Sequence, residues 1–457
     1  MNKGTVLAGA HLASFGGSAN SSSPTTATPP HLHDASQQAG ILRHVLQDDK
    51  QRIGWLLGAG CPLGVYDKDG AKSVTLIPAV VELTNRIANG LKQEDERGNL
   101  TSTYRAHWDS LCADCKLSTG PSPTVEDVLT ELRTLAHRRG SAPVGGIAKD
   151  KLRELDDKIC ALVIEEVKKR LPMYRSAYTR FASWIAGLQR AFPIEVFTPN
   201  YDLLLEQAFE RHPLPHFDGF VGSREPWFDL ASIEHDVVPS RWTRLWKLHG
   251  SINWERLEET VNEQSVSRVV RVTGDATQGK VMIFPSHLKY DQSRRMPYLA
   301  MQDRFRSFFR SGGLSLRKGE EGNDAPRLIV CGYSFLDVHL NEVLLDGLRG
   351  NRSAQCFALM YGKLSDHLRA VQYAEKQGNL TVLAYDGAVV GTRVGLYRQG
   401  TSGGDEHGTW LEESDYKDAI SGAVTKRTWC RLGDFHFLGL FLENLYGSGS
   451  IDVRRST

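Results

Sequence analysis

Short apolar segments recur along the chain, and several are followed by a stretch with helical periodicity. The segments are IGWLL at 53–57, IEVFTPNYD at 194–202, RLWKLHGS at 244–251, KVMIFPS at 280–286, RLIVCGYS at 327–334, QCFALMYG at 355–362 and LTVLAYDG at 380–387. Short apolar runs that end at Gly, Pro, Asn or Asp are typical of buried parallel strands. The pattern therefore predicts an α/β fold with a doubly wound, mainly parallel sheet.

A long, mainly helical region separates the first two of these segments. Its strongest pattern is PTVEDVLTELRTLAHRR at 123–139, which places apolar side chains on one face of a helix. These side chains are Val125, Val128, Leu129, Leu132, Leu135 and Ala136. Further helices are predicted at 151–171 and 178–192. The region of about 100–192 is therefore expected to be a helical insertion between two strands of the sheet.

Composition divides the chain into three parts. Residues 1–38 are rich in Ser, Thr, Gly and Pro, so burial cannot repay their ordering entropy, and they are predicted to form a flexible N-terminal arm. Residues 39–392 carry the strands and the insertion and form the main domain. Residues 393–457 are expected to be a polar loop followed by a docking segment. In that segment, FHFLGLFLENLYG at 435–447 has the pattern of a terminal helix that docks on the body or on a partner.

Charge and cysteine content narrow the class of protein. The 457-residue chain has 55 Lys and Arg against 54 Asp and Glu, which gives no electrostatic reason to expect nucleic acid or a membrane as the main partner. Its seven Cys lack the spacing of a disulfide framework and fit a reducing compartment, so we expect a cytoplasmic protein. The sequence has no apolar stretch of membrane-spanning length and no signal-peptide pattern at its N-terminus.

Polar or glycine clusters follow four of the predicted strands. They are Gly58-Ala59-Gly60, Thr198-Pro199-Asn200-Tyr201-Asp202, His249-Gly250-Ser251 and Gly332-Tyr333-Ser334. Taken singly, each has an ordinary explanation: a tight turn for the first, a helix cap for Asp202 or Asp337, and a structural role for His249. Ligands of open α/β sheets bind at the carboxyl ends of the strands, where helix N-termini present unpaired N–H groups. The four clusters together therefore predict a single binding cleft.

The order and spacing of LLGAGCP, TPNYD, KLHGS and CGYSFLDVHLN resemble the sirtuin-like (silent information regulator) superfamily, specifically the bacterial branch that cleaves NAD in defence against phage. The resemblance covers roughly 41–386 and implies a Rossmann-like fold. It implies that Gly58, Ala59 and Gly60 form the turn against the NAD pyrophosphate and the nicotinamide-side ribose. A glycine there lets the backbone approach the diphosphate closely, and the alternative is a turn that requires positive φ.

The same resemblance assigns the remaining site residues. In the second motif, Thr198, Asn200 and Asp202 are expected beside the nicotinamide ribose, and His249 matches the catalytic histidine of the family. In the last motif, the turn near the adenosine ribose is matched by Gly332, Tyr333 and Ser334, with Tyr333 in place of the threonine of the family. Asp386, after the last predicted strand, is expected near the adenine.

These residue types fit cleavage of the nicotinamide glycosidic bond. The reaction develops positive charge on the ribose, so it needs a polar acceptor, a positioned nucleophile and exclusion of bulk water. Histidine titrates near neutrality and suits His249 to take a proton from a ribose hydroxyl or a water. The amide of Asn200 can hold water and ribose without titrating, and Asp202 is expected to orient ribose or nicotinamide. NAD would be a substrate that yields nicotinamide and ADP-ribose, or a cyclised form.

Two alternatives stand beside NAD hydrolysis. One is NAD-dependent protein deacylation, the reaction of those sirtuins that carry a zinc ribbon of two Cys-x-x-Cys pairs and a Phe-Gly-Glu substrate strand. This chain has a single such pair, Cys112 and Cys115, before the histidine motif, and MIFPSHLKYDQ at 282–292 replaces the substrate strand, so we expect no metal. The other is a non-catalytic sensor subunit that binds NAD or ADP-ribose.

An unrestrained NAD hydrolase would poison its own cell, so a control mechanism is expected. The helical region 100–192 and the segment 435–447 are candidates, through self-assembly into a homo-oligomer or through a partner. The resemblance suggests a co-encoded ATPase or a nucleic-acid-handling defence protein as that partner, abortive infection as the setting, and no membrane.

Overall fold

The structure is a computed structural model of the chain. It describes residues 31–65, 76–91, 102–118, 123–137, 148–235, 238–239, 241–261, 264–272, 297–310, 323–398, 409–417 and 424–445. The predicted strand KVMIFPS lies outside these residues, as does most of the predicted N-terminal arm.

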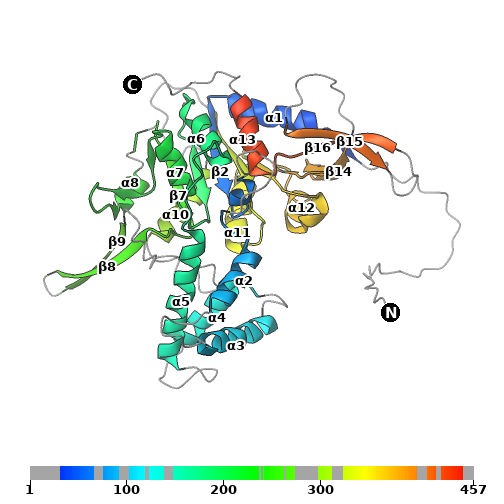
Figure 1. Ribbon diagram of the computed structural model, residues 1–457. Coiled ribbons are helices and arrows are strands. Elements are labelled where there is room, and N and C mark those ends of the chain that lie inside the picture. Colours follow the sequence, from blue (N-terminus) through cyan, green and yellow to red (C-terminus); the bar gives the residue numbers. More distant parts are fainter. Residues whose placement is uncertain are drawn as a thin grey trace, which may run out of the picture.

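A ten-stranded sheet forms the centre of the molecule, in the order β1-β14-β13-β12-β11-β10-β2-β3-β7-β4 (Figure 1). Its strands are β1 (Leu32–His33), β2 (Gln51–Leu57), β3 (Glu195–Thr198), β4 (His216–Phe217), β7 (Thr243–Lys247), β10 (Asn323–Cys331), β11 (Gln355–Leu359), β12 (Leu380–Leu383), β13 (Gly387–Val390) and β14 (Arg393–Tyr397). From β12 to β4 every neighbouring pair is parallel, whereas β13 pairs antiparallel with both β12 and β14. The predicted mainly parallel sheet is confirmed.

The strand order gives the sheet a topological switch point. After the short edge strand β1, the chain enters the middle of the sheet with β2, adds β3, β4 and β7 on one side, and then returns to add β10, β11 and β12 on the other side. This is the order of the Rossmann fold, and its switch point lies between β2 and β10. Dinucleotides bind there in such folds because the loops of the two halves diverge at the carboxyl ends of these strands.

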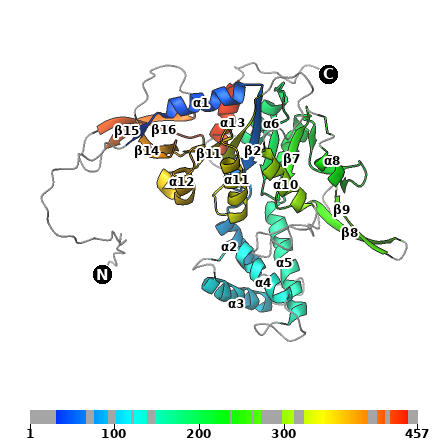
Figure 2. The ribbon, with the colours of Figure 1, turned by 180° about the vertical axis from the view of Figure 1, so that it is seen from behind.

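Alternate residues of the strands face two hydrophobic layers. Trp55 of β2 and Ile329 of β10 face one layer, whereas Leu56 and Val330 face the other. The first layer includes α1 (Ala35–Gln47), α6 (Ala177–Ala186), α7 (Leu204–Arg211) and α13 (Phe435–Asn444). The second includes α8 (Leu230–Glu234), α10 (Tyr298–Phe308), α11 (Val338–Gly350) and α12 (Leu368–Ala374). Helices therefore cover both faces of the sheet, as the doubly wound pattern predicts (Figure 2).

The helical insertion lies between β2 and β3 and projects away from the sheet (Figure 1). It consists of α2 (Val80–Gly90), α3 (Ser102–Ser118), α4 (Val125–His137) and α5 (Lys149–Val167). The predicted range of about 100–192 differs from it at both ends. α2 precedes that range, and α6 packs on the main body because both of its sides are apolar, with Phe181 and Trp184 against Trp55.

Both terminal parts contribute more regular structure than the sequence pattern indicates. α1 begins at Ala35 with its cap at Asp34, and β1 pairs with β14, so the predicted arm of 1–38 overlaps the fold by its last residues. The part predicted as a polar loop, which starts at 393, contains β14 of the main sheet and an antiparallel hairpin of β15 (Leu411–Lys417) and β16 (Val424–Cys430). The described side chains of this hairpin are largely polar and exposed, so they give no apolar strand signal.

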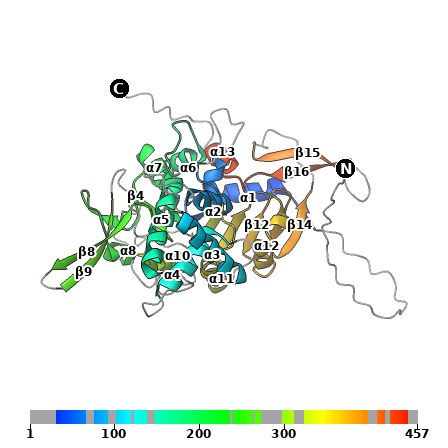
Figure 3. The same ribbon diagram turned by 60° about the horizontal axis from the view of Figure 1, so that its bottom comes forward.

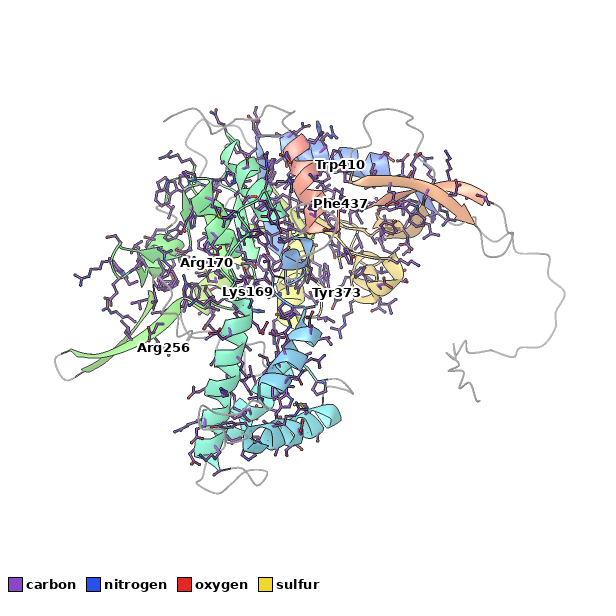
Figure 4. All side chains as sticks on the ribbon, viewed as in Figure 1. Lys169, Arg170, Arg256, Tyr373, Trp410 and Phe437 are labelled. Atoms are coloured by element: carbon purple, nitrogen blue, oxygen red, sulfur yellow. The ribbon has the colours of Figure 1, made fainter. Side chains whose placement is uncertain are left out.

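The C-terminal helix α13 docks on the main body. Phe435 packs edge-on against Tyr178 of α6, with ring centroids 5.0 Å apart. Trp410, labelled beside α13 in Figure 4, packs edge-on against Phe441 at 5.2 Å. The sequence left open whether this segment docks on the body or on a partner. In the structure it packs against the body.

A smaller four-stranded sheet lies at one end of the molecule. It has the order β5-β6-β9-β8, and its β8–β9 hairpin projects outward (Figure 3). The strands are β5 (Phe220–Val221), β6 (Trp227–Phe228), β8 (Trp254–Val261) and β9 (Gln264–Arg271). Within the described parts of the chain, none of the helices has the length and apolar character that crossing a membrane requires.

Candidate functional site at the switch point

The glycine turn after β2 is hydrogen-bonded to the turn after β10. The N–H of Gly58 donates to the carbonyl of Cys331 at 2.9 Å, and the N–H of Gly60 donates to the carbonyl of Gly332 at 2.8 Å. A Cβ on Gly58 would lie 2.4 Å from the Gly332 oxygen, and a Cβ on Gly60 would lie 2.9 Å from the Gly332 Cα. Backbone packing between the two turns therefore requires both glycines.

The backbone angles refine the reason predicted for these glycines. Gly60 has φ −76°, which any residue can adopt, so positive φ is not the constraint at this position. Gly332 has φ +66°, in the left-handed region that favours glycine. Ala59, between the two glycines, is exposed, so the turn presents its middle residue to solvent at the switch point.

Asn200 is tied to the glycine turn through its side chain. Its amide Nδ2 donates to the carbonyl of Gly58 at 3.1 Å. Its backbone N–H donates to the hydroxyl of Thr198 at 3.1 Å, and that hydroxyl donates to the carbonyl of Leu57 at 2.7 Å. Because these bonds join the ends of β2 and β3, Asn200 is held beside the turn, and its side chain is half-buried.

Asp202 lies deeper than Asn200. Its carboxylate accepts the N–H of Leu204 at 3.0 Å, at the start of α7, which matches the helix-capping alternative. Lys247 donates to the carbonyl of Asp202 and to the carboxylate of Glu206, the latter at 3.0 Å. Burial raises the pKa of Asp202 to about 6, although the charge of Lys247 opposes the shift. The predicted role of orienting a ribose remains a prediction.

His249 follows β7 and faces the start of α11. Its Nε2 lies 3.1 Å from Oδ2 of Asp337, and its side chain is 6% exposed. Its ring centroid is 6.4 Å from that of Tyr201. The adjoining backbone is fixed to the β3 turn, because the N–H of Ile252 donates to the carbonyl of Tyr201 at 3.0 Å and the N–H of Leu248 donates to the carbonyl of Thr198 at 2.8 Å. The asparagine and histidine motifs thus lie at adjacent strand ends.

The turn after β10 divides its side chains between interior and solvent. Tyr333 is buried, and its hydroxyl donates to Oδ1 of Asn341 at 2.8 Å, with the carbonyl of Asp337 at 3.1 Å. Burial raises the pKa of Tyr333 far above its usual value. Ser334 is exposed. Contact of this turn with a nucleotide would therefore involve its backbone and Ser334 rather than the Tyr333 ring.

The comparison with known families agrees with this geometry. Residues 194–382 match the family model of the SIR2-like domain. The chain carries a SIR2-like domain. The sirtuin-like superfamily predicted from the motifs is thereby confirmed, and SIR2-like proteins are generally NAD-utilising enzymes. No curated protein matches the chain.

The segment that matches the family model contains only part of the candidate site. The segment contains Asn200, Asp202, His249 and the turn after β10, whereas the Gly58–Gly60 turn precedes it. The structure joins that turn to the SIR2-like domain through the backbone bonds described above. The site is therefore completed by β2, which lies outside the matched segment.

Asp386 lies apart from the other candidates. It follows β12, two strands from β10, and its carboxylate accepts the N–H of Leu364 at 2.8 Å. This contact fixes the loop after β11. The structure therefore places Asp386 at the same sheet edge as the SIR2-like motifs without joining it to them, and its predicted place near the adenine remains a prediction.

The helical insertion reaches the site through α4. Burial raises the pKa of the Tyr201 hydroxyl well above its usual value, with further contributions from the charges of Glu126 and Asp337 and an opposing one from Arg133. Arg133 is itself held by Asp156 of α5, with an N–O distance of 2.9 Å. Charged residues of α4 therefore contribute, after burial, to the electrostatic surroundings of Tyr201, a contribution that the sequence pattern did not indicate.

The described residues contain no group of three or more His, Cys, Asp or Glu arranged to hold a metal ion. Cys112 and Cys115 both lie on α3, and burial raises the pKa of the Cys115 thiol to about 12, which keeps it protonated at neutral pH. The segment 282–292, which replaces the substrate strand of the deacylases, lies outside the described residues.

Proposed function

We propose that the chain is an NAD hydrolase that cleaves the nicotinamide glycosidic bond and releases nicotinamide and ADP-ribose. The observation that carries this proposal is the placement of Asn200 and His249 at adjacent strand ends, beside the glycine turn at the switch point. A dinucleotide whose pyrophosphate lies against that turn would present its nicotinamide ribose to the ends of β3 and β7.

The chemistry follows from the two side chains. Departure of nicotinamide leaves positive charge on the ribose, and the Oδ1 atom of Asn200 is an acceptor that can hold the attacking water or a ribose hydroxyl. His249 accepts the proton that this water or hydroxyl loses. Asn200 is held through its Nδ2, so its acceptor is positioned before substrate arrives and needs no reorganisation.

Nicotinamide release by purified protein tests the proposal. The assay compares the wild type with Asn200→Ala and His249→Ala, each checked for an unchanged thermal unfolding midpoint. We expect at least a hundredfold loss of turnover in both variants, because a positioned general base or oriented nucleophile contributes about 10²–10⁴ in rate. Full activity in both variants would contradict the proposal.

Two further outcomes separate the alternatives. NAD-dependent release of acyl groups from lysine peptides would identify a deacylase. Binding of NAD or ADP-ribose without turnover, in the presence of candidate activators as well, would identify a sensor. Protein deacylation is less favoured because the sequence has one Cys-x-x-Cys pair, on α3, rather than the two pairs of a zinc ribbon.

We further propose that this activity depletes cytoplasmic NAD in anti-phage defence by abortive infection. Such an enzyme needs restraint, and α4 is suited to supply it because its Glu126 and Arg133 lie close enough to affect Tyr201, which lies beside His249. α5 is linked to α4 through the ion pair of Asp156 with Arg133. A homo-oligomer, or a co-encoded ATPase or nucleic-acid-handling partner, would act on the site by moving these helices. Activity that appears only on assembly or on partner addition supports this part of the proposal.

A further inference from the structure

Asp337 contacts both the catalytic histidine and the start of a helix. Its Oδ2 lies 3.1 Å from Nε2 of His249, and its Oδ1 accepts the N–H groups of His339 and Leu340 at 3.0 and 3.2 Å. We infer that Asp337 is a positioning residue that fixes the ring orientation and tautomer of His249. This inference rests on the proposed function, because it assigns His249 the role of base.

The chemistry of the two groups fixes the direction of the contact. An ionised carboxylate can only accept hydrogen bonds, so Nε2 of His249 donates its proton to Asp337. In the neutral ring the lone pair then resides on Nδ1. Nicotinamide leaves with the electron pair of the glycosidic bond, and the oxygen of the attacking water or hydroxyl forms the new bond to the ribose carbon. The O–H bond of the attacking group breaks, and its proton forms a new N–H bond at Nδ1. Asp337 stabilises the resulting imidazolium without taking a proton.

Asp337 is held firmly enough to position a partner. Its backbone carbonyl lies 3.1 Å from the hydroxyl of Tyr333, which also donates to Asn341 one helical turn along α11. Asn341 in turn donates to the carbonyl of Phe335 at 2.8 Å, and Phe335 has φ +58°. Hydrogen bonds of Tyr333 and Asn341 therefore hold the loop between β10 and α11 in place around Asp337.

In this arrangement, the buried Tyr333 and the segment SFLD at 334–337 support the position of Asp337. Three titratable groups of the described residues lie near Asp337: His249 from the β7 loop, Tyr201 from the β3 loop and Tyr333 from its own loop. Both tyrosine hydroxyls have a raised pKa and stay neutral near pH 7, so among these groups the ring of His249 is the one that can carry a positive charge beside the carboxylate of Asp337.

Asp337→Asn tests the inference without removing the helix cap. Asparagine is as good an N-cap as aspartate, so the thermal unfolding midpoint should stay close to that of the wild type. We expect kcat to fall on the order of a hundredfold while KM for NAD stays within about twofold, because the base loses its orientation and binding does not. The acid limb of the pH–rate profile should move to lower pH, since His249 is harder to protonate without a neighbouring negative charge.

A matched control and a double variant exclude a general effect of the substitution. Asp34→Asn makes the same change at the N-cap of α1, where Asp34 accepts the N–H of Gln37 at 3.1 Å, and should leave kcat unchanged. In a His249→Ala background, Asp337→Asn should cause no additional loss, because the two groups act as a unit. A full additional loss, an unchanged kcat in the single variant or a rise in kcat would each overturn the inference.

Nitrogen-15 NMR of histidine-labelled protein separates failure of this inference from failure of the proposed function. The His249 signals, assigned by their loss in His249→Ala, should report a proton on Nε2 in the wild type and an altered proton distribution in Asp337→Asn. This readout needs no turnover. If no nicotinamide is released while the Nε2 proton is present, the proposed function fails and the pairing stands. A neutral ring protonated on Nδ1 overturns the pairing whether or not NAD is cleaved.

Discussion

At the scale of single residues, the burial of Asp202 makes its ionised carboxylate costly for stability. Its pKa of about 6 exceeds the usual value of 3.8, so the folded chain binds this proton more tightly than the unfolded chain does. The ionised carboxylate therefore destabilises the fold above about pH 6, and the penalty disappears as the pH falls below the unfolded value. A residue retained in such a position at neutral pH is a candidate for a role other than stability.

Asp202→Asn should make the protein more stable at pH 7.5. The amide oxygen can still accept the N–H of Leu204, and the cost of burying a charge is removed, so we expect the free energy of unfolding to rise by on the order of 2 kcal/mol. Urea unfolding at pH 7.5 and pH 4 measures it, and the gain should largely vanish at pH 4. Asp48→Asn should give the opposite sign, because a hydrogen bond from Gln51 lowers the pKa of Asp48. A stability loss in Asp202→Asn at pH 7.5 would contradict this view of burial.

The sequence predicted which residues lie together at the strand ends, whereas the role of each side chain remains a prediction. Motif spacing identified Asn200 and His249, because strand ends of a parallel sheet share one edge. Close approach of a ligand at Gly60 remains a prediction, and the structure adds a reason that the sequence did not indicate, because a Cβ there would meet the backbone of Gly332. For Asp337, the sequence predicted only a helix cap. Contacts between separate strand ends depend on the order of the strands in the sheet. The apolar pattern of the sequence does not reveal that order.

At the scale of elements, a buried ion pair fixes β2 to β3. Arg52 and Glu195 lie 3.0 Å apart with side chains almost fully buried, and Arg304 of α10 lies 3.5 Å from the same carboxylate. The indole N–H of Trp246 donates to Glu195 at 3.1 Å. The arginine charges lower the pKa of Glu195 despite its burial, so it is ionised at neutral pH. The pair holds together the two strands whose far ends carry the glycine turn and Asn200.

Glu195→Gln should destabilise the protein strongly. It leaves Arg52 and Arg304 as buried cations without their counter-charge, which costs about 3–5 kcal/mol in comparable sites. Chemical denaturation at pH 7.5 measures the change. Asp346→Asn breaks the exposed pair of Asp346 with Arg349 and should have no measurable effect. Equal effects in the two variants would show that the buried pair does not fix these strands.

Elements were predicted where their side chains carry a periodic apolar pattern. α4 and the buried strands β2, β3 and β10 meet this condition. The β15–β16 hairpin does not, because its stability comes from backbone pairing along its full length while its described side chains are mostly exposed. β1 is two residues long and too short to show any period. Such elements depend on a pairing partner that is distant in sequence, here β14 for β1.

At the scale of the whole molecule, the topology of the sheet brings the sequence motifs together in space. The order β7-β3-β2-β10-β11-β12 places the four polar clusters at one edge, around the switch point between β2 and β10. The sequence predicted parallel strands with helices on both faces. The insertion was also predicted, but not that α4 would act electrostatically on the asparagine motif.

The central claim is that the nicotinamide ribose of NAD lies between Asn200 and His249, with the pyrophosphate at the Gly58–Gly60 turn. The most direct test is a crystal structure of the His249→Ala variant with NAD, since slowed turnover should preserve the intact dinucleotide. We expect the glycosidic bond beside Oδ1 of Asn200 and the diphosphate against the turns that end β2 and β10. A dinucleotide bound elsewhere, or bound here with its nicotinamide directed away from β3 and β7, would contradict the claim.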